Sequence, residues 1–250
     1  MSARDRFLTV MGRKPVIEAL HDQSLTFDKI LLSDRAHGDE INTITGMAAS
    51  RKIAVENVTE MKVTAVARNA RHHQGVVADV VAPAMEHLSD FCERRRRGKD
   101  WACSLLLLDH VHNPANVGMI LRSATAAGID GVIVPHKGTA DIGPVAIKAS
   151  AGVAFRATIL RCQTTNEALA MLRDHRFTLV GLDGQGTPLF DVELPERAAY
   201  VVGNESAGLS QAATDAMEMT FSIPLANNVE SLNAAVAASV VGFEIARRSR

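Results

Sequence analysis

Residues 104–109, with the sequence SLLLLD, decide the fold of this chain. Four successive leucines between short polar residues are typical of a central strand that is covered on both faces of its sheet. A turn rich in Asn and Pro follows at residues 113–118 (NPANVG). A helical pattern then runs to Ala127, where Gly128 is a natural end. This order of strand, turn and helix predicts an α/β unit.

The same order recurs along the rest of the chain. Further apolar strands are expected at residues 131–135, 156–160, 178–182, 199–203 and 219–223, and helices at 143–151, 165–175, 209–217 and 231–248. Because strands alternate with helices and are apolar almost throughout, residues 103–250 are predicted to form a mostly parallel, doubly covered sheet.

Residues 1–83 predict a separate, smaller α/β unit. Its apolar residues lie in strands and one helix, at 29–33, 53–55 and 75–81 and at 39–50. The pattern stops at Pro83, and residues 84–102 are charged around a run of four arginines. Such a composition is typical of a linker. We therefore expect a domain over 1–83, a basic linker over 84–102 and a second domain over 103–250.

The composition is that of an ordinary globular protein, 47% hydrophobic and 22% charged. No apolar run approaches the ~18 residues that span a bilayer, so no membrane partner is expected. The start of the chain lacks the apolar core of a signal peptide. Cys92, Cys103 and Cys162 are widely spaced, and they predict free thiols in a reducing cytoplasm.

The charge is unevenly distributed. The net charge of −1 argues against a strongly electrostatic nucleic-acid binder, but residues 1–100 carry +2 and residues 101–250 carry −3. Two basic clusters lie in the first part: residues 94–97 with Lys99, and the group Arg68, Arg71, His72 and His73. Each cluster either contacts phosphates or is a solvated linker or turn, and the sequence leaves both interpretations open.

Several common sites are absent from the sequence. The glycines of residues 181–186 lack the G-x-G-x-x-G spacing and no strand precedes a G-x-x-x-x-G-K-[ST] loop, so neither a dinucleotide site nor a P-loop is expected. No C-x-x-C pair occurs, and His110 and His112 lack a third ligand at a zinc spacing, so no metal is expected. No serine lies in a G-x-S-x-G turn, which disfavours an α/β-hydrolase.

Polar side chains follow three of the predicted strands, and such turns meet at the carboxyl edge of a parallel sheet. In the first turn, Asn116 lies at a helix start, where it caps the helix or belongs to a site. Arg122 lies in an otherwise apolar helix, so it either pairs internally or holds a phosphate or carboxylate. In the second turn, Glu205 lies between Gly203 and Gly208, either as an exposed carboxylate or as part of the same site.

The third turn follows Ile223 and Pro224. Ser231 is well placed to cap the final helix, with Asn233 in its first turn. The free N–H groups of a helix start bind anions, so a substrate phosphate is expected there. Together the three turns predict one composite site.

The final helix has two apolar sides. A stripe of large residues is suited to the protein's own core: Leu232, Val236, Val240 and Phe243. A side of small residues either faces the same core or lies in a homodimer interface: Ala234, Ala237, Ala238 and Val241.

The three turns resemble the motifs of the SpoU (TrmH-type) RNA ribose 2′-O-methyltransferases, which belong to the SPOUT superfamily. That family has N-x-G-x-x-x-R-[ST], G-x-E-x-x-G and I-P-(x)-S-L-N segments. They are matched in order by residues 116–123 (NVGMILRS), 203–208 (GNESAG), and 223–224 with 231–233 (IP and SLN). After Asn233 this chain has two alanines where many members have Val-Ser, which leaves the asparagine in place.

The resemblance extends to the first unit. Residues 12–20 and 73–76 are similar to the small RNA-binding domain that precedes the catalytic domain in the ribosomal-RNA branch of the family. That domain shares its fold with an RNA-binding ribosomal protein.

The resemblance implies a deep trefoil knot around the third motif, and a homodimer whose active site is completed across the interface. It also implies S-adenosylmethionine as the cofactor, bound in a bent pose in the knotted loops. The adenine would be held largely by backbone around five residues: Leu182, Gly203, Ile223, Leu225 and Leu232.

The implied reaction is in-line transfer of the methyl group to a ribose 2′-hydroxyl of RNA, with a guanosine of 23S ribosomal RNA as the expected target. Arg122 would bind the substrate phosphate and stabilise the developing alkoxide, or accept the proton; a guanidinium stays protonated at neutral pH, which favours the first role. Asn116 and Glu205 are expected to orient Arg122, and Ser231 and Asn233 to hold phosphate and ribose. A tRNA ribose methyltransferase and a non-catalytic RNA-binding or assembly protein are the alternatives.

Overall fold

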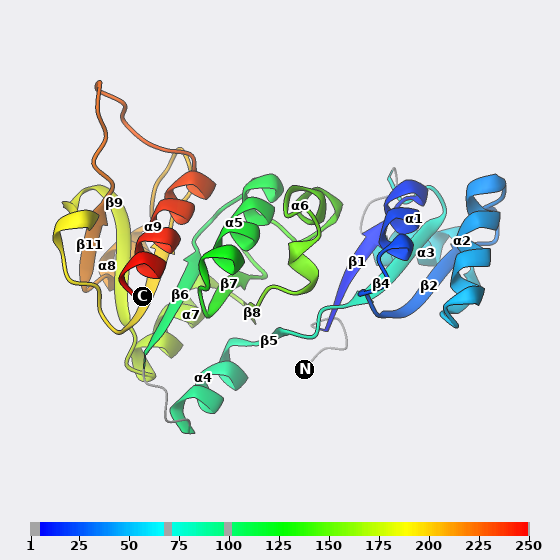
Figure 1. Ribbon diagram of the computed structural model, residues 1–250, viewed down its shortest axis with the longest axis horizontal. Coiled ribbons are helices and arrows are strands. Elements are labelled where there is room, and N and C mark those ends of the chain that lie inside the picture. The colour runs from blue at the N-terminus through cyan, green and yellow to red at the C-terminus, as the bar shows by residue number, and fades with distance from the viewer. Residues whose placement is uncertain (1–5, 68–71, 98–101, 250) are drawn as a thin grey trace. The chain divides into compact units, whose positions relative to one another are not determined.

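The computed structural model describes residues 6–67, 72–97 and 102–249, and the chain divides into two compact units, Met1–Pro83 and Ala84–Arg250 (Figure 1). The basic residues Arg68 and Arg71 and the linker residue Lys99 lie outside the described ranges.

The first unit is a four-stranded mixed sheet with the strand order β1-β4-β2-β3. Strand β4 pairs antiparallel with both β1 and β2, whereas β2 and β3 are parallel. The elements are β1 (Phe7–Met11), α1 (Arg13–His21), β2 (Phe27–Ser33), α2 (Asp39–Ser50), β3 (Ala54–Val58), α3 (Glu60–Ala67) and β4 (Val76–Val81). Leu31 and Val77 pack with Val63 and Ala67 of α3, so α3 covers one face of this sheet.

Strand β1 and helices α1 and α3 were not expected from the sequence. Strand β1 is short and its side chains are only alternately buried, so it lacks the apolar run that marks a central strand. Helix α1 begins directly after Gly12, whose φ of 93° is a backbone conformation that glycine adopts without strain.

The second unit confirms the predicted parallel sheet. Its seven strands have the order β11-β9-β10-β6-β7-β8-β5, and every adjacent pair is parallel. The strands are β5 (Met85–His87), β6 (Cys103–Leu108), β7 (Gly131–Pro135), β8 (Ile159–Cys162), β9 (Thr178–Pro188), β10 (Arg197–Val202) and β11 (Met219–Ser222). The helices are α4 (Leu88–Arg97), α5 (Pro114–Ala127), α6 (Pro144–Ala149), α7 (Thr165–Asp174), α8 (Gln211–Ala216) and α9 (Ala234–Arg248), with short 3-10 turns at Val153–Phe155 and Leu189–Asp191.

The leucine run forms the middle of this sheet, because β6 lies between β10 and β7. All four leucines are fully buried. Leu105 and Leu107 pack in a core with α4, α7 and α8, whereas α5 and α9 lie on the opposite face (Figure 1). Helices therefore cover both faces of the sheet, which is why the central strands carry no polar side.

Residues 84–97 belong to the second unit, whereas the sequence predicted a linker over 84–102. Met85–His87 form strand β5, which pairs with β8 at the edge of the sheet, and α4 follows directly. Phe91 and Cys92 of α4 are buried in the core of the second unit. The arginine run misled the prediction, because a helix can be rich in charged residues while one of its sides is buried.

Two arginines of this run, Arg94 and Arg95, form ion pairs with Glu86 and Asp130. Their guanidinium groups are thus engaged within the second unit. This favours a structural role for these two side chains over phosphate binding.

The small side of α9 follows one of the two interpretations that the sequence left open, whereas the large stripe differs from the prediction. The small side faces the protein's own core: Ala234, Ala238 and Val241 are buried, and Gly242 lies against Ala127 of α5. In the large stripe, by contrast, Val236 and Phe243 have exposed fractions of 49% and 53%. Small residues let α9 approach α5 closely, so the bulky side chains point outward.

The three cysteines are buried and unpaired, as expected. Burial raises the pKa of Cys92 to about 11, and that of Cys103 and of Cys162 to about 12. The described part of the chain contains no helix with the length and apolarity needed to cross a membrane.

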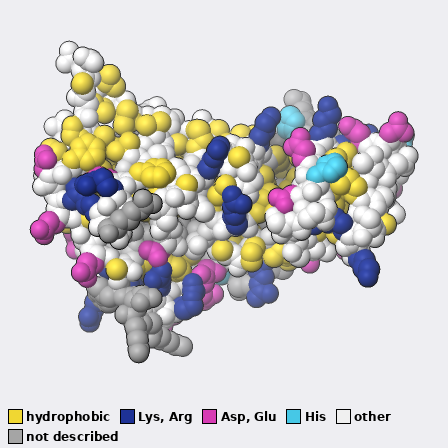
Figure 2. Space-filling model, in the orientation of Figure 1, with side chains coloured by type: hydrophobic (Ala, Val, Ile, Leu, Met, Phe, Trp, Pro, Cys, Tyr) yellow, Lys and Arg dark blue, Asp and Glu magenta, His cyan; other side chains and the backbone are white. Residues whose placement is uncertain are grey.

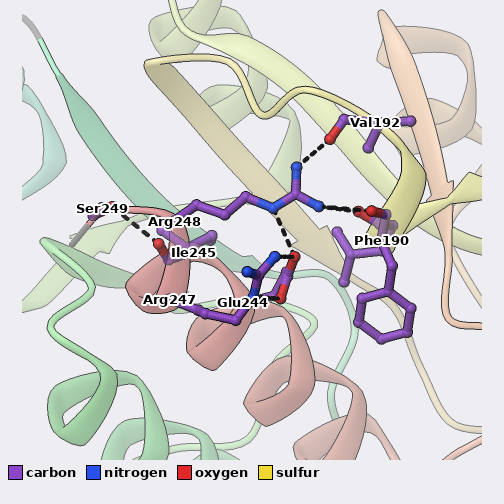
Figure 3. A network of polar contacts seen from close by, with 8 residues as sticks. Phe190, Val192, Glu244, Ile245, Arg247, Arg248 and Ser249 are labelled. Carbon is purple, nitrogen blue, oxygen red and sulfur yellow. Dashed lines mark hydrogen bonds and ion pairs between the residues drawn. The ribbon is translucent and has the colours of Figure 1, made fainter.

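A charged network anchors the end of α9 (Figure 3). The buried Glu244 accepts hydrogen bonds from Arg247, at 2.8 Å, and from Arg248 Nε, at 2.6 Å. Arg248 also donates to the main-chain carbonyls of Val192, Leu189 and Phe190. The network therefore ties α9 to the segment between β9 and β10.

This network predicts acid sensitivity of the second unit. Hydrogen bonds from Arg247 and Arg248, opposed by burial, lower the pKa of Glu244 from 4.5 to about 2. A lowered folded-state pKa contributes stability that is present above pH 4.5 and is lost as the pH falls toward 2. The difference in unfolding free energy between the parent and Glu244→Gln, measured by urea denaturation, should therefore shrink between pH 5 and pH 2. The exposed Glu230→Gln variant should follow the parent, and a difference independent of pH would contradict the assignment.

Candidate active site

The site lies at the carboxyl edge of the seven-stranded sheet, where β6, β10 and β11 end in the three predicted turns. Helix α5 begins after β6 and is capped by Asn113, whose Oδ1 accepts from the N–H of Ala115 at 2.9 Å. Pro114 occupies the first helical position, which suits its missing N–H. Asn116 therefore does not cap this helix, and its buried side chain is available for another partner.

A chain of three side chains joins the three turns. Asn116 Nδ2 donates to Glu205 Oε1, and Asn233 Nδ2 donates to Asn116 Oδ1 at 3.1 Å. Asn233 Oδ1 in turn accepts from the N–H of Ala235, at 2.9 Å, and so caps α9. The sequence separations are 89 and 117 residues, so the fold brings distant segments to one place. We call Glu205, Asn116 and Asn233 the amide–carboxylate triad.

Ser231 does not cap the final helix, contrary to the prediction. Helix α9 begins at Ala234, and Asn233 is its cap. Ser231 is exposed and lies two residues before the cap. Ser and Asn are both good capping residues, so sequence alone did not distinguish between them.

Arg122 lies apart from the triad. Its side chain is exposed on α5, and none of the described residues forms a hydrogen bond or an ion pair with its guanidinium. The sequence predicted that Asn116 and Glu205 orient Arg122. Within this chain neither does so, because Asn116 and Glu205 bind to each other and Asn116 also binds to Asn233. An exposed arginine on an apolar helix is available for a phosphate, a carboxylate or a second protein chain.

The turn that carries Glu205 is closed on itself. Asn204 and Gly208 exchange two main-chain hydrogen bonds of 2.9 Å, and Asn204 Oδ1 accepts from the N–H groups of Ser206 and Ala207. A Cβ on Gly203 would overlap with the backbone of Gly208. Only glycine fits at position 203, because the chain passes directly over itself there.

Asp109, the last residue of the SLLLLD segment, is a functional candidate that the sequence reasoning missed. It is fully buried. Its Oδ2 accepts from the N–H of Ser210, at 2.7 Å, and its Oδ1 lies 2.7 Å from His110 Nδ1. Asn204 Nδ2 also donates to the carbonyl of His110. Asp109 thus holds the Glu205 turn against the loop after β6. In the sequence, the charged residue directly after four leucines was the feature that could have pointed to Asp109.

We expect Asp109→Ala to weaken S-adenosylmethionine binding by about tenfold and to destabilise the second unit by about 2 kcal/mol, because the Ser210 N–H and the His110 ring lose their buried acceptor. Asp109→Asn keeps one acceptor oxygen and should lose less. Isothermal titration with the cofactor and urea unfolding measure both effects, with the exposed Asp215→Asn as control. Parent-like cofactor binding by Asp109→Ala would show that this carboxylate does not support the turn.

The five residues expected around the cofactor lie where strand pairings end or directly before helix α9 begins. Leu182 follows the last pairing of β9 with β10, Gly203 follows β10, and Ile223 and Leu225 follow β11. Leu232 lies directly before the Asn233 cap. Leu182, Ile223 and Leu232 are half-buried, and Leu225 is 39% exposed. Apolar side chains beside a tight glycine turn fit the adenine of S-adenosylmethionine, which needs apolar faces and backbone partners.

The irregular middle of β9 adds to this surface. Strand β11 pairs with Thr220↔Gly181 and then with Phe221↔Thr187, so residues 182–186 form an unpaired excursion. A Cβ on Gly186 would lie 2.6 Å from the backbone of Thr220, which explains the glycine. Bulges of this kind redirect side chains at functional edges.

A parallel sheet with these three turns defines a methyltransferase of the SPOUT class. The model of the SpoU rRNA methylase family matches residues 104–243, and that of the RNA 2′-O ribose methyltransferase substrate-binding domain matches residues 9–85. The chain therefore belongs to the SpoU family, and it is an S-adenosylmethionine-dependent RNA methyltransferase.

Relatives support the same assignment over the whole chain. It is 31% identical over 242 residues to a protein of Staphylococcus saprophyticus, and 32% identical over 240 residues to one of Staphylococcus aureus, both named as members of the TrmH family of tRNA/rRNA methyltransferases. These matches cover 96% of this chain and 96% and 95% of the relatives. The SpoU methyltransferase AviRb of Streptomyces viridochromogenes, crystallised with S-adenosylmethionine, is 25% identical, with a TM-score of 0.66 over 98% of this chain and 92% of that chain.

Proposed function

We propose that this enzyme methylates a ribose 2′-hydroxyl in RNA, with a guanosine of 23S ribosomal RNA as its target, in the cytoplasm. The observation that carries the proposal is the amide–carboxylate triad, which joins all three motif segments beside the residues suited to S-adenosylmethionine. The substrate-binding domain model that matches residues 9–85 favours ribose as the acceptor.

The reaction requires the hydroxyl and the donor methyl group to be aligned. The cofactor supplies a methyl group activated by its positive sulfonium. Asn116 and Glu205 fix the turn on which the cofactor rests, and Asn233 caps the start of α9 beside them. Alignment of two reactants contributes up to about 7–11 kcal/mol in well-oriented systems, so positioning is the main task of these residues.

Arg122 is the proposed group at the reacting hydroxyl. A guanidinium stays protonated at neutral pH, so it is a poor base. It binds the substrate phosphate and stabilises the negative charge that develops on the 2′-oxygen. Because Arg122 has no described partner in its own chain, it is free to act at a site shared with a second chain.

A homodimer would supply that second chain. The outward stripe of α9 exposes Val236 and Phe243, and Met119 of α5 is 41% exposed. Figure 2 shows hydrophobic side chains on the face over α9 and the loop before it. Exposed apolar side chains on two adjacent helices are typical of a protein interface. Pairing through these helices would bring Arg122 of one chain toward its partner. The trefoil knot of the family is proposed around the segment that carries the third motif.

If the protein is a homodimer with a shared active site, Phe243→Asp should affect both its oligomeric state and its activity. A charge placed in an apolar interface is costly, so we expect a monomer at micromolar concentration and a loss of methyl transfer of at least about 100-fold. Sedimentation velocity and a methyl-transfer assay measure the two. Met61→Asp, at a residue 79% exposed in the first unit, is the matched control. A monomeric variant with full activity would contradict a shared site.

Ribose-methylation mapping tests the substrate. Total RNA from a deletion strain, compared with its parent, should lack one 2′-O-methylated guanosine in 23S ribosomal RNA. A site lost from tRNA would support the tRNA alternative, which the tRNA/rRNA names of the relatives keep open. No lost site would favour a non-catalytic RNA-binding or assembly protein.

A further inference from the structure

The first unit contains a cleft of about 520 Å³ that the catalytic site does not explain. It lies where β1 and β2 end and where the turn before β4 begins. Its wall includes the side chains of Arg13, Arg35, Glu40, Glu60 and His73. Figure 2 shows basic, acidic and histidine side chains interspersed over the surface of this unit.

Two hydrogen bonds between Arg13 and Gln74 hold one side of the cleft. Arg13 N donates to Gln74 Oε1, at 3.1 Å, and Arg13 Nε donates to the Gln74 carbonyl, at 3.2 Å. Gln74 has a φ of 49° and Gly75 one of 79°, so two successive residues adopt left-handed conformations. A non-glycine residue in that region costs free energy and marks a turn that its surroundings enforce. The cleft is therefore preformed.

His73 orients the floor of the cleft. It is buried, and its Nδ1 accepts from the N–H of Gly75 at 3.0 Å. Because a main-chain N–H can only donate, the proton of a neutral His73 lies on Nε2, which faces Thr64 Oγ1 at 3.1 Å and Glu60 Oε1 at 3.6 Å. Glu60 lies beside the imidazole without a hydrogen bond to it, and its carboxylate, 41% exposed, keeps acceptor capacity toward the cleft.

The basic groups of the cleft are open to a ligand. Arg13 faces Glu40 only loosely, at 3.7 Å. Arg35 is exposed, and its guanidinium forms no hydrogen bond or ion pair with the residues that the structure describes. The guanidinium groups of Arg13 and Arg35 and the carboxylate of Glu60 suit a ligand that is anionic at one end and carries N–H donors at the other. An isolated phosphate lacks the donors and would meet the repulsion of two carboxylates.

We propose that this cleft binds an unpaired nucleotide of the RNA substrate, with its phosphate at Arg13 and Arg35 and its base edge at Glu60. Guanine is the matching base, because its N1–H and N2–H groups can both donate to one carboxylate. RNA-binding proteins commonly recognise unstacked bases by hydrogen bonds to their edges. The inference rests on the proposed function, since it assigns a recognition site for the same RNA.

Binding of labelled RNA hexamers to the full-length protein tests this assignment. The probes are oligoadenylate hexamers with a central guanosine, inosine or adenosine, and the readout is fluorescence anisotropy. The guanosine hexamer should bind about tenfold more tightly than the inosine one, which lacks the N2 amine. Glu60→Gln should abolish that preference, and Arg35→Gln should weaken all three hexamers about tenfold.

Controls separate this site from the catalytic one. Arg6→Gln, at the opposite end of β1, and Glu18→Gln, on the exposed side of α1, should bind like the parent. In a methyl-transfer assay, Arg35→Gln should raise KM for RNA without changing kcat. Hexamer binding that is Glu60-dependent supports the cleft even if mapping finds no methylated site. Equal binding of all hexamers, or parent-like binding by both variants, overturns it even in an active enzyme.

Discussion

Arg122→Ala should reduce methyl transfer by about 10³-fold while leaving the affinity for S-adenosylmethionine within about twofold of the parent. The reason is that Arg122 has no described partner in its own chain and does not contribute to the triad or to the residues suited to the cofactor. Its removal therefore deletes only the positive charge proposed to stabilise the 2′-oxygen. Single-turnover methylation and isothermal titration with the cofactor are the two measurements.

Two further variants sharpen this test. Arg122→Lys keeps the charge but not the planar fork, so it should recover only part of the lost rate. Arg156→Ala removes another exposed arginine of the second unit and should behave as the parent. If Arg122→Ala loses cofactor binding and thermal stability together with activity, the arginine has a structural role instead.

Gly118→Ala should destabilise the second unit by about 3 kcal/mol. A Cβ at this position would overlap with the carbonyl of Ala146 and lie 2.9 Å from Ala149 Cβ, where α5 packs on α6. Backbone cannot withdraw as a flexible side chain can, so the helices must separate. Calorimetry should show the transition of this unit lowered by roughly 6–12 °C.

Gly242→Ala is the matched control for that change. Gly242 is also a helical glycine in the contact between helices of this unit, but its added Cβ would meet Ala127 Cβ at an ordinary 3.4 Å. Alanine is the better helix former, so the stability should stay within about 1 kcal/mol of the parent. If Gly118→Ala were equally mild, α6 would have to move freely relative to α5.

The sequence predicted the structure best where the hydrophobic pattern of a segment matches its burial in the fold. The SLLLLD strand, the parallel sheet and the meeting of Asn116, Glu205 and Asn233 followed from apolar runs and from the geometry of strand ends. Strand β1 and helix α4 were missed because the strand is only half-buried and the sequence of the helix is dominated by the arginine run.

The errors at α9 and Arg122 have a different origin. Periodicity identifies the two sides of a helix, but it does not state which side meets the core, and here close packing against α5 selected the small residues. Spacing also could not show that Asn116 and Glu205 bind to each other and leave Arg122 without a described partner, because hydrogen bonds depend on the three-dimensional arrangement of distant turns. The position of Asp109 after four leucines marks it as unusual, but its partner Ser210, 101 residues later, could not be derived from spacing.

The triad has a consequence for how this enzyme acquires activity during folding. Its hydrogen bonds close loops of 89 and 117 residues, and closing such loops is entropically unfavourable until the intervening sheet has formed. The three side chains therefore meet only when the chain has been made through α9. A nascent or truncated chain that ends before Asn233 would have a formed central strand and no working site. Methyl transfer is therefore expected only from chains in which the whole second unit has folded.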